Sequence, residues 1–160
     1  MKNIFYLFAA ITLLFLYGCS RYCCDTPKPP DNIMFAEKDS VNWRAVASGS
    51  IVANDSIAIA GIGQNFGNNL YDTLTFRIKY NGLGGYSLNP ASASYNSSVG
   101  NGPPFNSYKL DTLFSNSLMV TFYDQPSNHI QGTFSIKFIN PANPAGIRFL
   151  YGNFKVALNK

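Results

Sequence analysis

The sequence predicts an all-β domain behind a cleaved leader, and three observations support this fold class. From Ile33 onward the apolar residues recur with a period of two, as on a half-buried strand. Turn-forming residues interrupt this pattern at intervals of roughly 8 to 14 positions. No stretch after the leader combines helical periodicity with capping residues. We therefore expect a single antiparallel β-sandwich, with a barrel-like meander as the alternative.

The chain begins with the layout of a secretory signal peptide. Lys2 precedes an apolar run from Ile4 to Tyr17, and this run is shorter than the about 20 apolar residues that span a membrane. Residues 1–18 are therefore predicted to be a signal peptide. An uncleaved membrane anchor and a secreted, unlipidated product are the alternatives.

The leader ends in Leu16-Tyr17-Gly18-Cys19, which resembles the lipobox of bacterial lipoproteins. The resemblance implies cleavage before Cys19 and attachment of a diacylglycerol to its thiol. Because two or more acyl chains anchor a protein stably, we expect a membrane-anchored lipoprotein of the bacterial cell envelope. The expected membrane is the outer membrane, with the domain on its periplasmic or its surface face.

All three cysteines lie at the start of the expected mature chain, at positions 19, 23 and 24. None remains in the domain to form a staple or a nucleophile, and neighbouring Cys23 and Cys24 would form a strained bridge. Residues 19–32 are rich in proline and predict a semi-rigid tether. Residues 33–160 then suffice for one all-β domain.

Charge and composition exclude several classes of function. The net charge is +4, and no run of basic residues exists, so no nucleic-acid partner is expected. No cofactor motif is present: Gly61-Ile62-Gly63 lacks the third glycine of a dinucleotide fingerprint and is interpreted as a turn or bulge. The only histidine, His129, is predicted to be an ordinary residue at a loop edge, and no metal site is expected.

Alternating residues place the strands in the first half of the domain. One strand is expected around Trp43, a second around Ile57 and Ile59, and a third up to the turn at Asn81. Two short strands follow, over 84–88 and 91–95, and a loop expected to be mobile runs from 96 to about 106. The residues expected to face the core are Val41, Trp43, Ala45, Ala47, Ile57, Ile59, Leu74, Phe76, Ile78 and Tyr80.

The last third of the sequence predicts three long strands in a meander. Residues 124–128 link the first pair and residues 141–146 the second, so consecutive strands should be antiparallel neighbours. Three inward stripes are expected: Leu118, Val120 and Phe122; Ile130, Phe134, Ile136 and Phe138; Leu150, Phe154, Val156 and Leu158.

Three short motifs carry a family resemblance. They are Asp39-Ser40-Val41-Asn42-Trp43-Arg44-Ala45, Ile130-Gln131-Gly132-Thr133-Phe134-Ser135-Ile136 and Tyr151-Gly152-Asn153-Phe154-Lys155-Val156. Together they resemble a family of small uncharacterised lipoproteins from Bacteroidota, although Ser40 stands where that family has glycine and the last motif reads Gly-Asn in place of Asn-Gly. The resemblance implies an all-β fold and a tethered location, and it implies no chemistry.

The aromatic fraction of 15% is the one compositional excess suited to binding. Trp43 and five of the thirteen phenylalanines fall on the expected core stripes, whereas five tyrosines fall off them or at loop edges. Since aromatic faces stack on sugar rings and pack against proteins, these five are the candidate ligand contacts. They are Tyr71, Tyr86, Tyr95, Tyr123 and Tyr151.

The sequence favours a non-catalytic binding or interaction module over an enzyme. Its partners would be the membrane, through the lipid, and an envelope protein reached through an edge strand or loops. A carbohydrate-binding β-sandwich is one alternative. A hydrolase is the other, since two of the scattered carboxylates could converge; these are Glu37, Asp39, Asp55, Asp72, Asp111 and Asp124.

Overall fold

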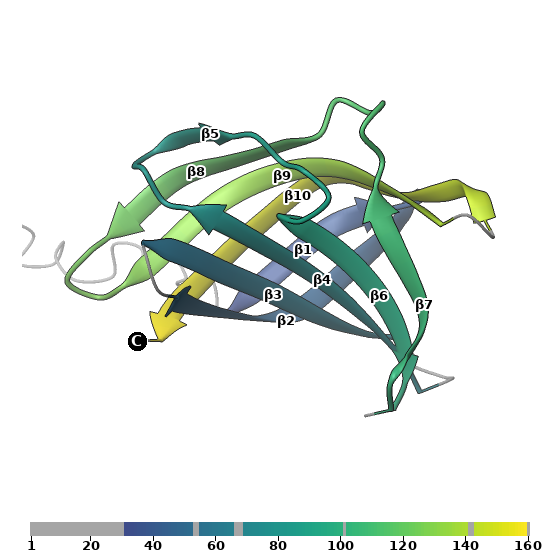
Figure 1. The fold of residues 1–160 in the computed structure, drawn as a ribbon. Coiled ribbons are helices and arrows are strands. Elements are labelled where there is room, and N and C mark those ends of the chain that lie inside the picture. The colour runs from purple at the N-terminus through teal and green to yellow at the C-terminus, as the bar shows by residue number, and fades with distance from the viewer. Residues whose placement is uncertain (1–30, 53–54, 66–68, 101, 141–142, 160) are drawn as a thin grey trace, which may run out of the picture.

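The computed structural model of the chain describes residues 31–52, 55–65, 69–100, 102–140 and 143–159. These ranges contain ten strands and no helix (Figure 1), so the all-β prediction is confirmed. The strands are β1 (Ile33–Lys38), β2 (Val41–Val52), β3 (Ser56–Asn65), β4 (Leu70–Lys79), β5 (Gly84–Tyr86), β6 (Ala93–Val99), β7 (Pro104–Leu110), β8 (Ser117–Asp124), β9 (His129–Asn140) and β10 (Asn143–Asn159).

All ten strands belong to one sheet, in the order β1-β10-β2-β3-β4-β6-β7-β9-β8-β5. In addition, β10 pairs with β9, and β1 pairs with β2. The pairing can therefore be followed from β2 through β3, β4, β6, β7, β9 and β10 to β1, which pairs with β2 again. Neighbouring strands are antiparallel except for a short parallel contact between β10 and β2. Figure 1 shows the sheet curving around itself. The two expected layers are therefore parts of one continuous sheet that face each other across the core.

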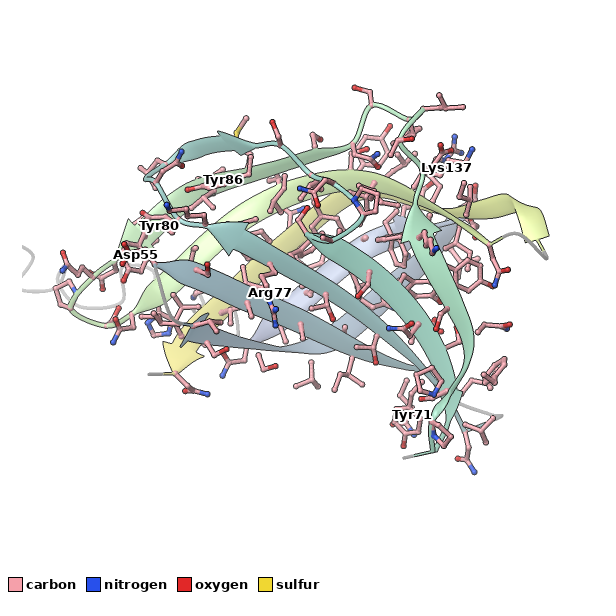
Figure 2. The ribbon with its side chains drawn as sticks, viewed as in Figure 1. Asp55, Tyr71, Arg77, Tyr80, Tyr86 and Lys137 are labelled. Carbon is pink, nitrogen blue, oxygen red and sulfur yellow. The ribbon has the colours of Figure 1, made fainter. Side chains whose placement is uncertain are left out.

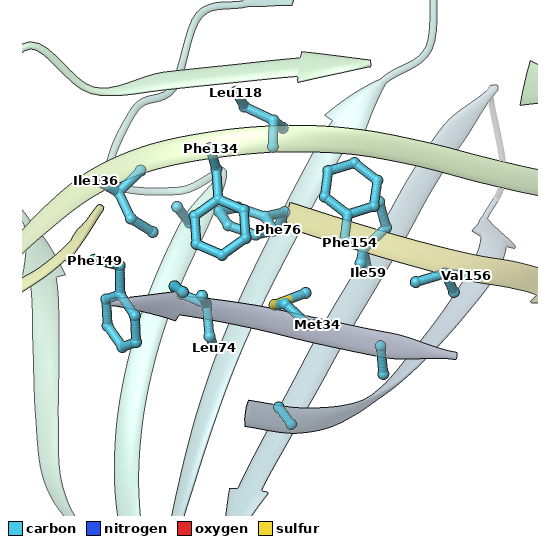
Figure 3. Packing of buried hydrophobic residues seen from close by; sticks show 14 of the residues in the cluster. Met34, Ile59, Leu74, Phe76, Leu118, Phe134, Ile136, Phe149, Phe154 and Val156 are labelled. Atoms are coloured by element: carbon cyan, nitrogen blue, oxygen red, sulfur yellow. The ribbon is translucent and has the colours of Figure 1, made fainter. Parts of the chain in front are cut away.

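The inward side chains form one hydrophobic core, which Figure 3 shows from close by. On β4 the alternation is as predicted, with Leu74 and Phe76 fully buried. Phe76 contacts Phe134 of β9 with ring centroids 5.1 Å apart. Burial of each such side chain stabilises the fold by about 1.5–3 kcal/mol, which makes this core the main source of stability.

Bulges shift two of the predicted stripes. Phe122 was expected inside, but it is 47% exposed, because the β8–β9 register shifts between Val120 and Phe122. Leu150 was also expected inside, whereas its neighbour Phe149 is the buried residue, because β10 carries a bulge that begins there. An extra residue in one strand inverts the alternation beyond it. The sequence pattern alone does not mark such a point.

The segment Gly61-Ile62-Gly63 is not the turn or bulge that was expected, since it lies within the regular ladder of β3. Its two glycines face the core, where larger side chains have no room. A Cβ atom at Gly63 would lie 2.4 Å from Nε1 of Trp43, and one at Gly61 would lie 2.7 Å from the sulfur of Met34. Close packing, and not chain reversal, therefore explains these glycines.

The expected loop from 96 to 106 is largely strand. β6 extends to Val99 and pairs with β7, which begins at Pro104, and Asn96 lies opposite Ser107. Serine and asparagine in these strands obscure the apolar alternation, which explains the error. The two short strands expected before this loop correspond to β5 and to the first part of β6.

The predicted signal peptide, Cys19, Cys23, Cys24 and nearly all of the tether lie outside the described residues. Within the described ranges no helix could cross a membrane. Of the tether predicted over residues 19–32, the structure describes only Asp31 and Asn32.

Candidate functional site

A break in the ladder between β2 and β3 forms the first hollow of interest. The β2–β3 pairing ends at Ala45 and Gly63, although β2 begins four residues earlier, at Val41. A hollow of about 330 Å³ lies at this break, which we call the β2–β3 opening. It is lined by Lys38, Asn42, Trp43, Arg44, Gln64 and Asp72, among others.

A polar cluster lies behind this opening, inside the sheet. The Nζ of Lys38 donates to Oδ2 of Asp72 and, over 2.7 Å, to the hydroxyl of Tyr95. The Oγ of Ser97 donates to Oδ1 of Asp72 over 3.1 Å. Lys38 also lies 5.1 Å from the centroid of the Tyr95 ring. The cluster thus joins β1, β4 and β6 at the place where β2 and β3 are not paired.

Tyr95 is fully buried, so the expectation that it is an exposed contact residue is wrong. It shares the inward face of β6 with Ala93, and its ring lies 5.3 Å from that of Phe149. Burial raises the pKa of its hydroxyl well above 10, and the Asp72 carboxylate adds to the shift. Tyr95 therefore stays protonated at any physiological pH and serves the core.

Trp43 forms the wall between the core and the opening. It is 8% exposed, and its ring meets Phe149 edge-on at 5.2 Å. Its Nε1 has no hydrogen-bond partner among the residues that the structure describes. The indole therefore closes the opening toward the core, and its position depends on the absence of a side chain at Gly63.

A bulge in β10 projects Tyr151 from the outer face of the sheet. Between Phe149 and Gly152 β10 advances by three residues while its partner β9 advances by two, from Ile136 to Phe134. The pairing with β1 shows the same extra residue. Tyr151 has a φ of 51° and is 78% exposed. Bulges reorient side chains in this way, and they are frequent next to functional sites.

Tyr151 borders a hollow of about 500 Å³, which we call the Tyr151 hollow. Phe35 provides a second aromatic side chain and is 46% exposed. Glu37, Asn42 and Arg44 add an anion, an amide and a cation to the lining. Since Asn42 and Arg44 also line the β2–β3 opening, the two hollows adjoin.

Tyr71 lies on a third hollow that also includes Arg44. This one measures about 690 Å³ and is more apolar, with Val46 and Ile62 opposite each other in the ladder. Val46 is 74% exposed, so the outer face of β2 and β3 is open here. Tyr71 is half-buried and stands next to Gln64 of β3. Two predicted tyrosines, Tyr71 and Tyr151, therefore border hollows that meet at Arg44.

Tyr86 and Tyr123 lie elsewhere, with Tyr80. Figure 2 shows Tyr80 and Tyr86 at the end of the molecule opposite Tyr71. The hydroxyl of Tyr86 accepts from the backbone N–H of Asn81 over 3.1 Å, and Tyr123 packs on Tyr80 at 5.1 Å. Burial and the two neighbouring tyrosines raise the pKa of Tyr80. These rings close one end of the core, and the structure does not bring them to Arg44.

The remaining candidate residues have local partners. Nδ1 of His129 lies 2.9 Å from Oγ of Ser127, in keeping with its predicted place at a loop edge. Asp111 forms an ion pair with Lys137 at 3.0 Å, which lowers the pKa of Asp111. No group of three potential metal ligands occurs among the described residues.

Sequence reasoning missed the inward ion pair, although the pattern contains a signal for it. Lys38 continues the alternation of Met34 and Ala36, and Asp72 precedes Leu74 at the same spacing. Two opposite charges on the inward faces of two strands predict a buried pair. The roles of Phe35 and Arg44 depend on the bulge at Tyr151, which no sequence signal marked.

One comparison with known proteins gives a match. The model of the family described as Domain of unknown function (DUF6252) matches residues 31–156, which includes β1 to β9 and most of β10. Searches of curated proteins and of solved structures found no match. Since the family model covers most of the chain and nearly all of the described sheet, the protein belongs to this family of unknown function.

Proposed function

We propose that the protein is a lipid-anchored lipoprotein of the bacterial cell envelope whose β-domain is a non-catalytic binding module. The anchor would be the diacylglycerol on Cys19, and the outer membrane is the proposed location. The binding site would be the outer face around Arg44, where the β2–β3 opening and the Tyr151 hollow adjoin.

The observation that carries the binding proposal is a pair of charged side chains, Arg44 and Glu37, that form no ion pair among the residues that the structure describes. Both side chains line the Tyr151 hollow. The other carboxylates near these hollows are engaged, since Asp72 binds Lys38 and Asp39 accepts from the backbone N–H of Arg148. Polar groups without an internal ion pair, next to exposed aromatic rings, are typical of a ligand-binding site.

The state of several carboxylates supports a non-catalytic role. A glycosidase needs one carboxyl group free to donate a proton and another free to attack or to activate water. Asp72 and Asp111 are instead held by Lys38 and Lys137. Glu37 is half-buried on the outer face, whereas Asp72 belongs to the inner cluster. These two carboxyl groups are therefore not placed to act together as an acid and a base.

Site-specific photo-crosslinking tests the binding proposal. A benzophenone amino acid replaces Tyr151 in the full-length chain in living bacteria, and the matched control carries it at Leu83, which is 64% exposed before β5. We expect covalent adducts from position 151 and a background yield from position 83. Equal yields at the two positions, or none at 151, would refute a binding site around Arg44.

A further inference from the structure

The described fold does not explain why residue 151 is a tyrosine. A φ of 51° disfavours a bulky side chain, and the cost of holding one there is on the order of 1–3 kcal/mol. Apart from Ser40, the other described residues with left-handed φ are Asn, Asp or Gly, which tolerate this conformation. Glycine or asparagine at 151 would thus form the bulge at lower cost.

Packing does not compensate for the strain. Tyr151 is 78% exposed, so its ring adds little to the core. The bulge itself is held by the backbone pairing on both sides and by Asn153, whose Nδ2 donates to the Tyr151 carbonyl over 2.9 Å. That bond needs no phenol ring. The ring is therefore best explained by a contact outside the described fold.

The neighbours of Tyr151 define the chemistry of that contact. Phe35 offers a second ring in the same hollow, while Arg44 and Asn42 offer hydrogen-bond donors, and Glu37 and Asn42 offer acceptors. A ligand that fits must combine flat apolar faces with donors and acceptors along its edge. An acyl chain would leave the polar groups unpaired, and a phosphate would be repelled by Glu37.

We propose that the Tyr151 hollow binds carbohydrate. A sugar ring has C–H groups on its faces, which stack on aromatic rings, and hydroxyls on its edge, which both donate and accept. Tyr151 and Phe35 would contact the faces, while Arg44, Asn42 and Glu37 would bind the hydroxyls. This inference rests on the proposed binding role and names the ligand class for the same site.

Affinity electrophoresis of the full-length chain in detergent tests the inference. The gels contain soluble β-glucan, mannan, xylan or dextran. We expect wild type to be retarded by at least one of these. Tyr151→Ala and Phe35→Ala should weaken that retardation at least about tenfold, whereas Tyr151→Phe keeps the ring and most of the affinity. Phe122→Ala is the matched control, since Phe122 is as exposed as Phe35 but lies on β8, outside the hollow.

The outcomes separate this inference from the broader proposal. No retardation by any polysaccharide, combined with a protease-sensitive crosslink at position 151, would overturn carbohydrate binding and leave the binding module intact. Retardation that Tyr151→Ala and Phe122→Ala reduce equally would overturn the assigned site. Absence of both retardation and crosslinks would overturn both proposals.

Discussion

Tyr151 shows how one residue can carry a conformation that its own chemistry disfavours. Its backbone lies in the left-handed region and its ring lies in solvent. If the ring serves a ligand and not the fold, removing it should cost no stability.

We therefore expect Tyr151→Asn to raise the free energy of unfolding, by up to about 1 kcal/mol, because asparagine tolerates the left-handed conformation. Chemical denaturation of the full-length chain measures the change. A loss above about 1 kcal/mol would show that the ring supports the fold.

The pair of Lys38 and Asp72 should behave in the opposite way. Their side chains are only 23% and 14% exposed, so Lys38→Met leaves a carboxylate that is largely buried without its cation. We expect a loss of about 1–3 kcal/mol of unfolding free energy. Lys79→Met, on the exposed end of β4, is the control and should change stability by less than about 0.5 kcal/mol. Equal losses would show that the pair contributes nothing specific.

Asp111 gives a pH-dependent prediction. Its hydrogen bond to Lys137 lowers its pKa below 3.8 in the folded chain. A carboxyl group with a lowered folded pKa stabilises the fold above its unfolded pKa, and this contribution is lost as the pH falls through the folded pKa. Asp111→Asn should therefore lower the melting temperature at pH 7 and have a smaller effect in acid, once the pH has fallen through the folded pKa of Asp111. A difference that stays constant across this range would argue against the ion pair.

At the level of elements, β9 and β10 are joined by a reciprocal pair of glycines and phenylalanines. Gly132 lies opposite Phe154, and Gly152 lies opposite Phe134. A Cβ at Gly152 would lie 2.3 Å from the Phe134 ring, and one at Gly132 would lie 2.4 Å from the Phe154 ring. Each ring occupies the space that a glycine leaves free, which gives a physical reason for the two motifs noted in the sequence.

Gly152→Ala should consequently displace the Phe134 ring and destabilise the chain by about 1–3 kcal/mol. Gly85→Ala is the control, since a Cβ there meets no atom within 4 Å. Thermal unfolding compares the two variants. Similar melting temperatures would show that the β9–β10 packing is more adaptable than the structure implies.

The strands were predictable from the sequence wherever one alternating run was uninterrupted, as in β4 and β9. The prediction failed at the bulges near Phe122 and Leu150, because one inserted residue inverts the facing of all that follow. It failed again in β6 and β7, where polar residues replace the apolar alternation. The candidate site was the part that the sequence predicted least well. Its residues Phe35, Arg44 and Tyr151 come together only through the long-range pairing of β1 with β2 and β10.

At the scale of the whole molecule, the described sheet begins at Ile33, next to the Tyr151 hollow, which Ile33 helps to line. If Cys19 is lipidated, the tether predicted over residues 19–32 would hold the proposed binding face within a few tens of ångströms of the membrane. A tether of this length would favour ligands of the envelope itself.

Lipidation has a direct test. Cells that express the chain are fed an alkyne-tagged fatty acid, and the purified protein is examined by intact mass and by label. The wild type should carry the label and lack residues 1–18, while Cys19→Ala should lose the label. Cys23→Ala and Cys24→Ala should keep it. Label on the Cys19→Ala variant, or a wild type without any adduct, would refute the proposed anchor.

Covalent footprinting of aromatic residues in the native envelope tests the central claim, that the face around Tyr151 holds a ligand. The same chain is labelled by hydroxyl radicals in intact envelopes and after extraction in detergent, and mass spectrometry gives the rate at each ring. We predict that Tyr151 and Phe35 are protected in the envelope, while Phe122 and Phe105, which are comparably exposed to Phe35, react equally in both. Equal rates at Tyr151 in the two preparations would contradict the account.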